Sequence, residues 1–190
     1  MTLSRRAFLS TISAAAFAQQ QAAKPKRDPD VPYVPTTEEA VKAMLKLADV
    51  KKSDVVYDLG CGDGRIVVAA AKSFGARGVG IDINPVRIQE ANENAKKSGV
   101  TDLVRFEEND LFLANFHEAT VVTLFLLPQI NLKLLPRLRE QLKPGTRLVS
   151  NTFDMGDWKP LKTVEVEGGD DEETFLSRKL FLWVIPEKGR

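Results

Sequence analysis

Three glycines that follow the acidic residue Asp58 form the part of the sequence best suited to bind a ligand. Gly60, Gly62 and Gly64 lie between a short apolar run and a helix-like run. Glycines allow the backbone to turn sharply, and they let a ligand approach main-chain N–H and C=O groups closely. The spacing differs from the dinucleotide pattern G-x-G-x-x-G, because the bulky Arg65 stands where that pattern needs a small residue. We therefore disfavour a nicotinamide-dependent oxidoreductase.

Two further acidic residues come at the ends of the next two predicted strands. Asp82 ends the second strand, where its carboxylate can accept hydrogen bonds from both hydroxyls of a ribose, and it could also cap the helix at Pro85. Asp110 follows the third strand, where it can accept a hydrogen bond from the exocyclic amine of adenine. In an open α/β sheet these strand ends lie along one crevice, so one adenosine ligand could contact all of them.

Alternating strand and helix signals predict a parallel α/β sheet that brings these residues together. Threonines 36 and 37 followed by two glutamates predict the start of the first helix. The predicted strands are 54–59, 78–83, 103–107, 119–127 and 146–152, followed by a hairpin of 161–167 and 175–184 across the acidic turn 168–171. The other predicted helices are 66–72, 85–97 and 131–142.

Composition and charge limit the function classes. The 190 residues carry 27 Lys+Arg and 26 Asp+Glu, so the net charge of +1 gives no sign of a nucleic-acid-binding surface or a polybasic membrane arm. The 43% hydrophobic content fits a globular domain rather than a disordered chain. The single cysteine, Cys61, and the single histidine, His117, exclude an internal disulfide framework, a multi-cysteine zinc site and a histidine-rich metal site. We expect no bound metal, and Cys61 to be a packing residue.

The first 18 residues have the pattern of an export signal. Arg5 and Arg6 precede an uncharged stretch, 7–18, that ends in the A-x-A pattern of a cleavage site, and residues 4–9 are similar to a twin-arginine signal. We expect residues 1–18 to be a signal peptide, 19–30 a flexible leader and 31–190 the folded domain. Twelve apolar residues are too short to cross a hydrocarbon core of ~30 Å, so we expect no membrane span in the mature chain. The expected location is outside the cytoplasm, or the cytoplasm if the signal is not used.

The glycines and acids together resemble class I S-adenosylmethionine-dependent methyltransferases, over roughly residues 32–158. The segments VPYVPT (31–36), DLGCGDGRIV (58–67) and FDMGDWKP (153–160) are similar to those of small bacterial methyltransferases of unassigned substrate. They also resemble, more loosely, mitochondrial protein-lysine methyltransferases. The resemblance implies a Rossmann-like, three-layer α/β fold with a mostly parallel seven-strand sheet in the order 3-2-1-4-5-7-6. It also implies S-adenosylmethionine as the cofactor.

The resemblance implies a set of residues that bind this cofactor. The set is Tyr33, Thr36, Asp58, Gly60, Cys61, Gly62, Gly64, Asp82, Ile83, Asp110 and Leu111. Asp58 and the Gly60 backbone would hold the amino group of the methionine part, and Tyr33 and Thr36 would close over that end as a short lid. Asp82 would bind the ribose.

The remaining members of the set would surround the adenine and the base of the pocket. Ile83 would pack on the adenine, and Asp110, with Leu111 beside it, would bind the adenine amine. Gly62 and Gly64 would shape the floor of the pocket.

The end of the fourth strand bears on the methyl acceptor. Amine and base methyltransferases often carry Asn/Asp-Pro-Pro-Tyr/Phe there, whereas this chain has Leu-Leu-Pro-Gln at 126–129. We therefore expect a protein lysine or a small molecule as acceptor, and no nucleic acid. Candidate acceptor contacts are Pro128, Asp154, which could help an amine lose its proton, and Trp158, which could stack on a substrate or pack on the sheet.

An alternative function stays open at this point. The departure at 126–129 and the export signal would also fit a non-catalytic adenosine-ligand-binding or scaffold protein with the same fold. An exported enzyme would be separated from fresh cofactor unless it left the cytoplasm folded and loaded. No catalytic base and no oligomeric state is predicted.

Overall fold

The computed structural model describes residues 28–29, 31–166 and 179–187. The predicted signal peptide, most of the leader and the acidic turn 168–171 lie outside the described residues. The strands are β1 (Val55–Leu59), β2 (Arg77–Asp82), β3 (Val104–Glu108), β4 (Val121–Leu124), β5 (Arg147–Asn151), β6 (Lys162–Glu165) and β7 (Lys179–Val184). The helices are α1 (Glu38–Leu47), α2 (Arg65–Phe74), α3 (Pro85–Ser98) and α4 (Pro128–Gln141). No helix within these ranges is long and apolar enough to cross a membrane.

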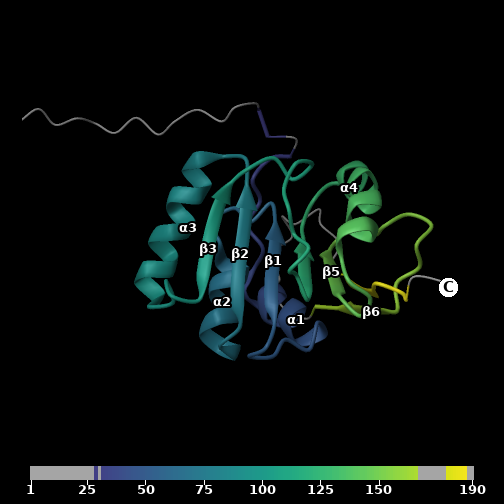
Figure 1. The fold of residues 1–190 in the computed structure, drawn as a ribbon, viewed down its shortest axis with the longest axis horizontal. Helices are drawn as coiled ribbons and strands as arrows, with labels where there is room; N and C mark the ends of the chain where they lie inside the picture. Colours follow the sequence, from purple (N-terminus) through teal and green to yellow (C-terminus); the bar gives the residue numbers. More distant parts are fainter. Residues whose placement is uncertain (1–27, 30, 167–178, 188–190) are drawn as a thin grey trace, which may run out of the picture.

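The seven strands form one sheet in the order β3-β2-β1-β4-β5-β7-β6 (Figure 1). The first five pair in parallel, whereas β7 runs antiparallel to both β5 and β6. The predicted strand order is confirmed. Because β1 to β5 are parallel, their carboxyl ends meet at one edge of the sheet, which is where the sequence places the ligand-binding residues.

Helices cover both faces of the sheet (Figure 1). On one face, apolar residues of α1 and α2 pack against alternate residues of β1, β4 and β5, and α3 packs beside α2 over β2 and β3. On the other face, α4 and the segment that follows β3 pack against the remaining residues of these strands. The predicted three-layer arrangement is thus confirmed.

The predicted strand at 119–127 is wrong in its length. β4 ends at Leu124, and α4 begins at Pro128, three residues before the predicted helix start at 131. Proline suits the first turn of a helix, because that turn has no hydrogen-bonding partner for its N–H groups. The apolar residues 125–127 therefore leave the sheet at the edge where the ligand-binding residues lie.

Two side-chain caps place the helices beside this edge. Thr37 Oγ1 accepts a hydrogen bond from the Ala40 N–H at 3.2 Å, which confirms the predicted start of α1. Asn84 Oδ1 accepts from the Val86 N–H at 2.9 Å and caps α3. The alternative prediction that Asp82 caps α3 is wrong, because its carboxylate accepts from the N–H groups of Gly62 and Asn84.

A partly buried ion pair joins α1 to the amino ends of the central strands. Arg147 forms a salt bridge with Asp54, and its Nη1 donates to the Ala48 carbonyl at 2.7 Å, at the end of α1. Asp54 also accepts from Thr120 Oγ1 and from the Lys51 N–H, both at 2.7 Å. Burial alone would raise the pKa of Asp54, but these hydrogen bonds and Arg147 outweigh it and lower that pKa.

Replacing Arg147 with methionine should lower the free energy of unfolding by about 3 kcal/mol at pH 7, because it leaves a buried carboxylate without its cation. The pKa of Asp54 is lower in the folded state, so its contribution is present above the unfolded pKa of about 3.9 and is lost as the pH falls through the folded pKa. Urea unfolding should therefore show a difference between wild type and variant that shrinks below about pH 4. Arg77→Met, at an exposed site on β2, is the control and should change stability little.

Candidate active site

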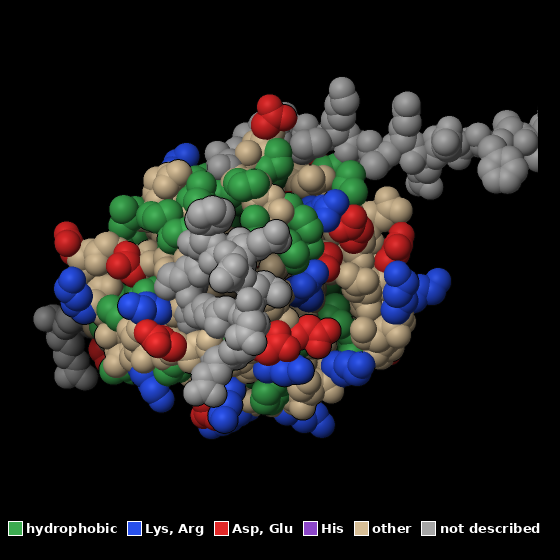
Figure 2. All heavy atoms as spheres, turned by 180° about the vertical axis from the view of Figure 1, so that it is seen from behind, with side chains coloured by type: hydrophobic (Ala, Val, Ile, Leu, Met, Phe, Trp, Pro, Cys, Tyr) green, Lys and Arg blue, Asp and Glu red, His purple; other side chains and the backbone are tan. Residues whose placement is uncertain are grey.

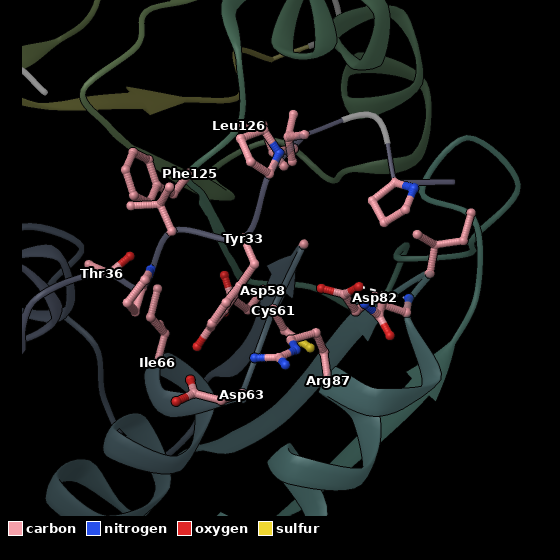
Figure 3. Close-up of a pocket in the computed structure, with 18 of the residues that line it drawn as sticks. Tyr33, Thr36, Asp58, Cys61, Asp63, Ile66, Asp82, Arg87, Phe125 and Leu126 are labelled. Atoms are coloured by element: carbon pink, nitrogen blue, oxygen red, sulfur yellow. Dashed lines mark hydrogen bonds between the residues drawn. The ribbon is translucent and has the colours of Figure 1, made fainter. Parts of the chain in front are cut away.

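A cavity of about 420 Å³ opens at the carboxyl ends of the central strands (Figure 3). Its walls come from the segment 31–36, from the glycine loop after β1, from the end of β2 and from the residues after β4. Of the predicted cofactor-binding residues, the lining includes Tyr33, Thr36, Asp58, Gly60, Cys61, Asp82, Ile83 and Leu111. Gly62, Gly64 and Asp110 do not line it. The volume suits a small-molecule ligand.

Asp58 presents a buried carboxylate to this cavity from β1. Asp58 is only 3% exposed, and its Oδ1 accepts a hydrogen bond from Thr123 Oγ1 at 2.7 Å. Burial raises the pKa of Asp58 to about 7, assisted by Asp82 and Asp63 and opposed by the Thr123 hydrogen bond. A carboxylate that is this poorly solvated favours a cationic ligand group, which would compensate its charge.

The glycine loop has a left-handed backbone at each of its glycines, with φ of 84° at Gly60, 52° at Gly62 and 74° at Gly64. Gly62 also has a neighbour that excludes any side chain. A Cβ atom there would lie 2.4 Å from Cε2 of Tyr33, whose ring rests against the loop. The glycines therefore do two things: they give the turn its shape, and they let the segment 31–36 lie close to it.

Asp82 joins the glycine loop to the loop before α3. Its Oδ2 accepts from the Gly62 N–H, and its Oδ1 accepts from the Asn84 N–H, both at 2.9 Å. Each carboxylate oxygen has a second lone pair, so both keep the capacity to accept a hydrogen bond from a ligand hydroxyl. Asp82 lines the cavity. The side chain can thus shape the site and bind a diol within it.

The residues after β3 enter the site unequally. Leu111 lines the cavity, whereas Asp110 accepts a hydrogen bond from the Phe112 N–H at 2.8 Å and so stabilises a turn.

Cys61 is buried in the glycine loop. Its burial, and to a smaller degree the negative charges of Asp58 and Asp82, raise the pKa of its thiol well above the usual value. A thiol that resists ionisation is a poor nucleophile, which fits the predicted packing role.

Several cavity residues were not singled out by the sequence. These are Asp63, Arg65, Arg87 and Phe125, among others. The spacing of the glycines marked Arg65 only as an obstacle to dinucleotide binding, but it begins α2 and its side chain reaches back to the segment 31–36. Arg87 lies in the first turn of α3, with its guanidinium carbon 4.4 Å from the centroid of the Tyr33 ring. The only feature of the sequence that could have marked Arg87 as a cavity residue is its position in the first turn of a predicted helix.

The three predicted acceptor contacts lie outside the cavity lining. Pro128 begins α4, and Asp154 Oδ1 accepts from the Gly156 N–H at 3.0 Å. Trp158 packs on Trp183, with ring centroids 5.9 Å apart, which favours its packing role. Within the described ranges, no group of three or more His, Cys, Asp or Glu residues could hold a metal ion.

Comparison with known proteins identifies the family. Residues 58–162 match the family described as the ANTKMT methyltransferase domain. A protein-lysine N-methyltransferase of Saccharolobus islandicus is 47% identical over 160 residues, which are 84% of this chain and 96% of that protein. The adenine nucleotide translocase lysine N-methyltransferase of Mus musculus is 33% identical over 140 residues, which are 74% of this chain and 60% of that protein.

A solved structure adds the cofactor. The RNA methyltransferase of Salinibacter ruber, crystallised with S-adenosylhomocysteine, is 54% identical, with a TM-score of 0.75 over 83% of this chain and 97% of that one. S-Adenosylhomocysteine is what remains of S-adenosylmethionine after methyl transfer. The cavity fits that cofactor, since it offers a buried carboxylate for an ammonium and a second carboxylate for a ribose. The predicted fold, cofactor and enzyme class are confirmed. The chain belongs to the ANTKMT methyltransferase family and is an S-adenosylmethionine-dependent methyltransferase.

Proposed function

We propose that this methyltransferase transfers the methyl group to the side-chain amine of a lysine in a protein acceptor. The observation that carries the proposal is the 47% identity to a protein named as a protein-lysine N-methyltransferase, over nearly the whole length of that protein. The match to the adenine nucleotide translocase lysine N-methyltransferase agrees with it. The cavity supports it as well, because an apolar wall of Phe125, Leu126 and Ile130 can accept the aliphatic part of a lysine.

The binding roles follow from the charges around the cavity. Asp58 would hold the ammonium of the methionine part, because its buried carboxylate lacks a cation within the described residues. Asp82 would hold the ribose hydroxyls with its remaining lone pairs. Ile83 and Leu111 would pack against the adenine. Tyr33 and Thr36 would cover the methionine end.

The chemistry asks for alignment rather than for a catalytic nucleophile. S-Adenosylmethionine, when bound, supplies a methyl group already activated on a sulfonium. The protein must hold the acceptor nitrogen in line with that group and exclude water. The apolar side chains of Phe125, Leu126 and Ile130 disfavour a charged amine in their vicinity, so they would promote loss of the proton that blocks the lysine nitrogen. The proton would leave to solvent at the open mouth of the cavity.

An RNA acceptor is the second candidate, because the similar Salinibacter ruber protein is named an RNA methyltransferase. Charge and surface character favour the protein acceptor. The chain has a net charge of only +1, whereas binding to nucleic acid draws on an excess of cations. Figure 2 shows hydrophobic side chains gathered along the edge at which the parallel strands end. Tyr33, Val34 and Leu113 are among the exposed hydrophobic residues, with Leu113 77% exposed. Such a rim suits a protein surface.

Incubation of the enzyme with methyl-labelled S-adenosylmethionine and a cell extract should yield a label that protease removes and ribonuclease leaves. Acid hydrolysis should then release labelled methyl-lysine. The control variant, Asp82→Ala, should bind cofactor roughly a hundredfold more weakly, because it loses charged hydrogen bonds to the ribose, and should give no label at the same cofactor concentration. A label removed by ribonuclease would replace the lysine assignment with the RNA assignment.

A further inference from the structure

The segment 31–36 crosses the cavity at its mouth before the chain enters α1 (Figure 3). Every residue of this segment lines the cavity, yet it makes up no part of a helix or strand. Tyr33 is 43% exposed and Val34 is 44% exposed, so burial in the core does not fix their positions. The place of this segment must therefore depend on specific contacts with the rest of the site.

Arg65 supplies the first of these contacts. Its Nη1 donates to the main-chain carbonyl of Thr36 at 2.8 Å, across a separation of 29 residues. Its Nε and Nη2 donate to the two carboxylate oxygens of Asp63, at 2.9 and 2.7 Å. Two parallel hydrogen bonds of this kind fix the orientation of a guanidinium as well as its distance. The third nitrogen of Arg65 is thus aimed at the segment by Asp63.

Asp63 supplies the second contact. Burial would raise the pKa of Asp63, but the hydrogen bonds and the charge of Arg65 outweigh it, with a smaller contribution from the nearby Tyr33 hydroxyl, and lower that pKa. Asp63 therefore stays ionised near neutral pH and holds the Arg65 guanidinium in place beside Tyr33. Figure 3 shows its carboxylate below the Tyr33 side chain.

The Tyr33 ring completes the arrangement. It rests against Gly62, where a Cβ atom would come within 2.4 Å of it, and the Arg87 guanidinium lies 4.4 Å from its centroid. A guanidinium over an aromatic ring is attractive, and the contact joins the segment to α3. Tyr33 is thus fastened to the glycine loop, to the start of α2 and to α3 at once.

We propose that Asp63 and Arg65 are positioning residues that fasten the segment 31–36 over the cofactor and slow its release. The proposal rests on the cofactor placement given above, with Asp58 at the ammonium and Asp82 at the ribose. Neither Asp63 nor Arg65 needs to touch the reacting atoms. Their effect passes through Tyr33 and Thr36, which they hold across the mouth of the cavity. Slower release keeps the cofactor in place while a protein acceptor docks.

The test measures the rate at which S-adenosylhomocysteine leaves the enzyme. The complex is mixed with excess S-adenosylmethionine in a stopped-flow instrument, so that each released molecule is replaced. Arg65→Met should raise the dissociation rate roughly tenfold, because it removes charged hydrogen bonds at the mouth, and change the association rate little. Arg65→Lys should restore only part of the effect, since lysine cannot form the paired contact. With methylated product as the readout, KM for S-adenosylmethionine should rise more than kcat falls.

Tyr33→Phe removes only the hydroxyl of a residue that is 43% exposed, so the protein should fold as wild type and still release the ligand faster. Combining it with Asp63→Asn should add little to the effect of Asp63→Asn alone, because the Tyr33 hydroxyl acts through Asp63. Arg105→Met is the matched control: Arg105 forms an ion pair with Glu107 at the same spacing of two residues, away from the cavity, and should leave the rate unchanged.

Unchanged dissociation rates in Arg65→Met and Tyr33→Phe would overturn the proposal, as would a loss of thermal stability without any change in release. The rate measurement needs no methyl acceptor. An RNA acceptor in place of lysine would therefore leave this test intact, whereas failure of the wild type to bind S-adenosylhomocysteine would refute the cofactor placement itself.

Discussion

Asp58→Asn is expected to weaken S-adenosylmethionine binding by about a hundredfold or more at pH 8, because it removes the buried charge that would meet the ligand's ammonium. Asparagine has nearly the same shape, and its carbonyl oxygen can still accept from Thr123 Oγ1. The loss should therefore come from charge and not from misfolding. Calorimetric titration of both proteins gives the comparison.

The same variant should make the unliganded protein more stable at neutral and higher pH. The pKa of Asp58 is about 7 in the folded state and about 3.9 when unfolded. The folded state thus holds a proton between these values that the unfolded state has lost, so this group's contribution to stability falls as the pH rises from about 4 to 7 and levels off above. Asp58→Asn removes that decline. Its gain in the free energy of unfolding should be largest above pH 7.

Cofactor affinity should carry the opposite pH dependence. The ammonium needs an ionised carboxylate, so protonation of Asp58 competes with binding, and wild-type affinity should fall by up to about tenfold per pH unit below pH 7. Thr123→Val should shift this fall to higher pH, because the Thr123 hydrogen bond lowers the pKa of Asp58. A wild-type affinity that stays constant from pH 5.5 to 8.5 would contradict the assignment.

Local patterns predicted the glycine loop and, to within one residue, the ends of β1, β2 and β3, because those features depend on neighbours in sequence. The end of β4 was not predicted. Residues 119–127 are nearly all apolar, yet only Val121–Leu124 pair in the sheet. Phe125 and Leu126 are apolar for a different reason, since they line the cavity. Apolar residues are needed both in a buried strand and in the wall of a binding cavity. An apolar run in the sequence therefore does not show where the strand ends and the cavity wall begins.

Among the polar residues of the site, too, some were predicted from the sequence and others were not. Asp58 was predicted because it directly precedes the glycine loop, and Asp82 because it ends the next strand. Arg65 and Arg87 were not, because their contacts are with Thr36 and Tyr33, distant in sequence. These contacts exist only once the segment 31–36 lies across the glycine loop. Residues whose role depends on a crossing chain leave no local periodicity or spacing to detect.

Gly64 is where the glycine loop meets the core, and Gly64→Ala is expected to cost about 3 kcal/mol or more of the free energy of unfolding. Its φ of 74° disfavours any other residue, and a Cβ atom would lie 2.5 Å from Phe106 Cε1 and 2.8 Å from Ala91 Cβ. Phe106 belongs to β3 and Ala91 to α3, so the clash would push both away from the start of α2.

Gly99→Ala separates the two causes. Gly99 has a similar φ of 68°, but a Cβ atom there would meet nothing within 4 Å. Its cost should be about 1 kcal/mol, from backbone conformation alone. Urea unfolding of both variants then measures the packing part as the difference between them. Equal costs would mean that φ alone requires glycine at position 64. A larger cost at Gly64, accompanied by weaker cofactor binding, would mean that close packing of α2 against α3 and β3 holds the glycine loop in its binding conformation.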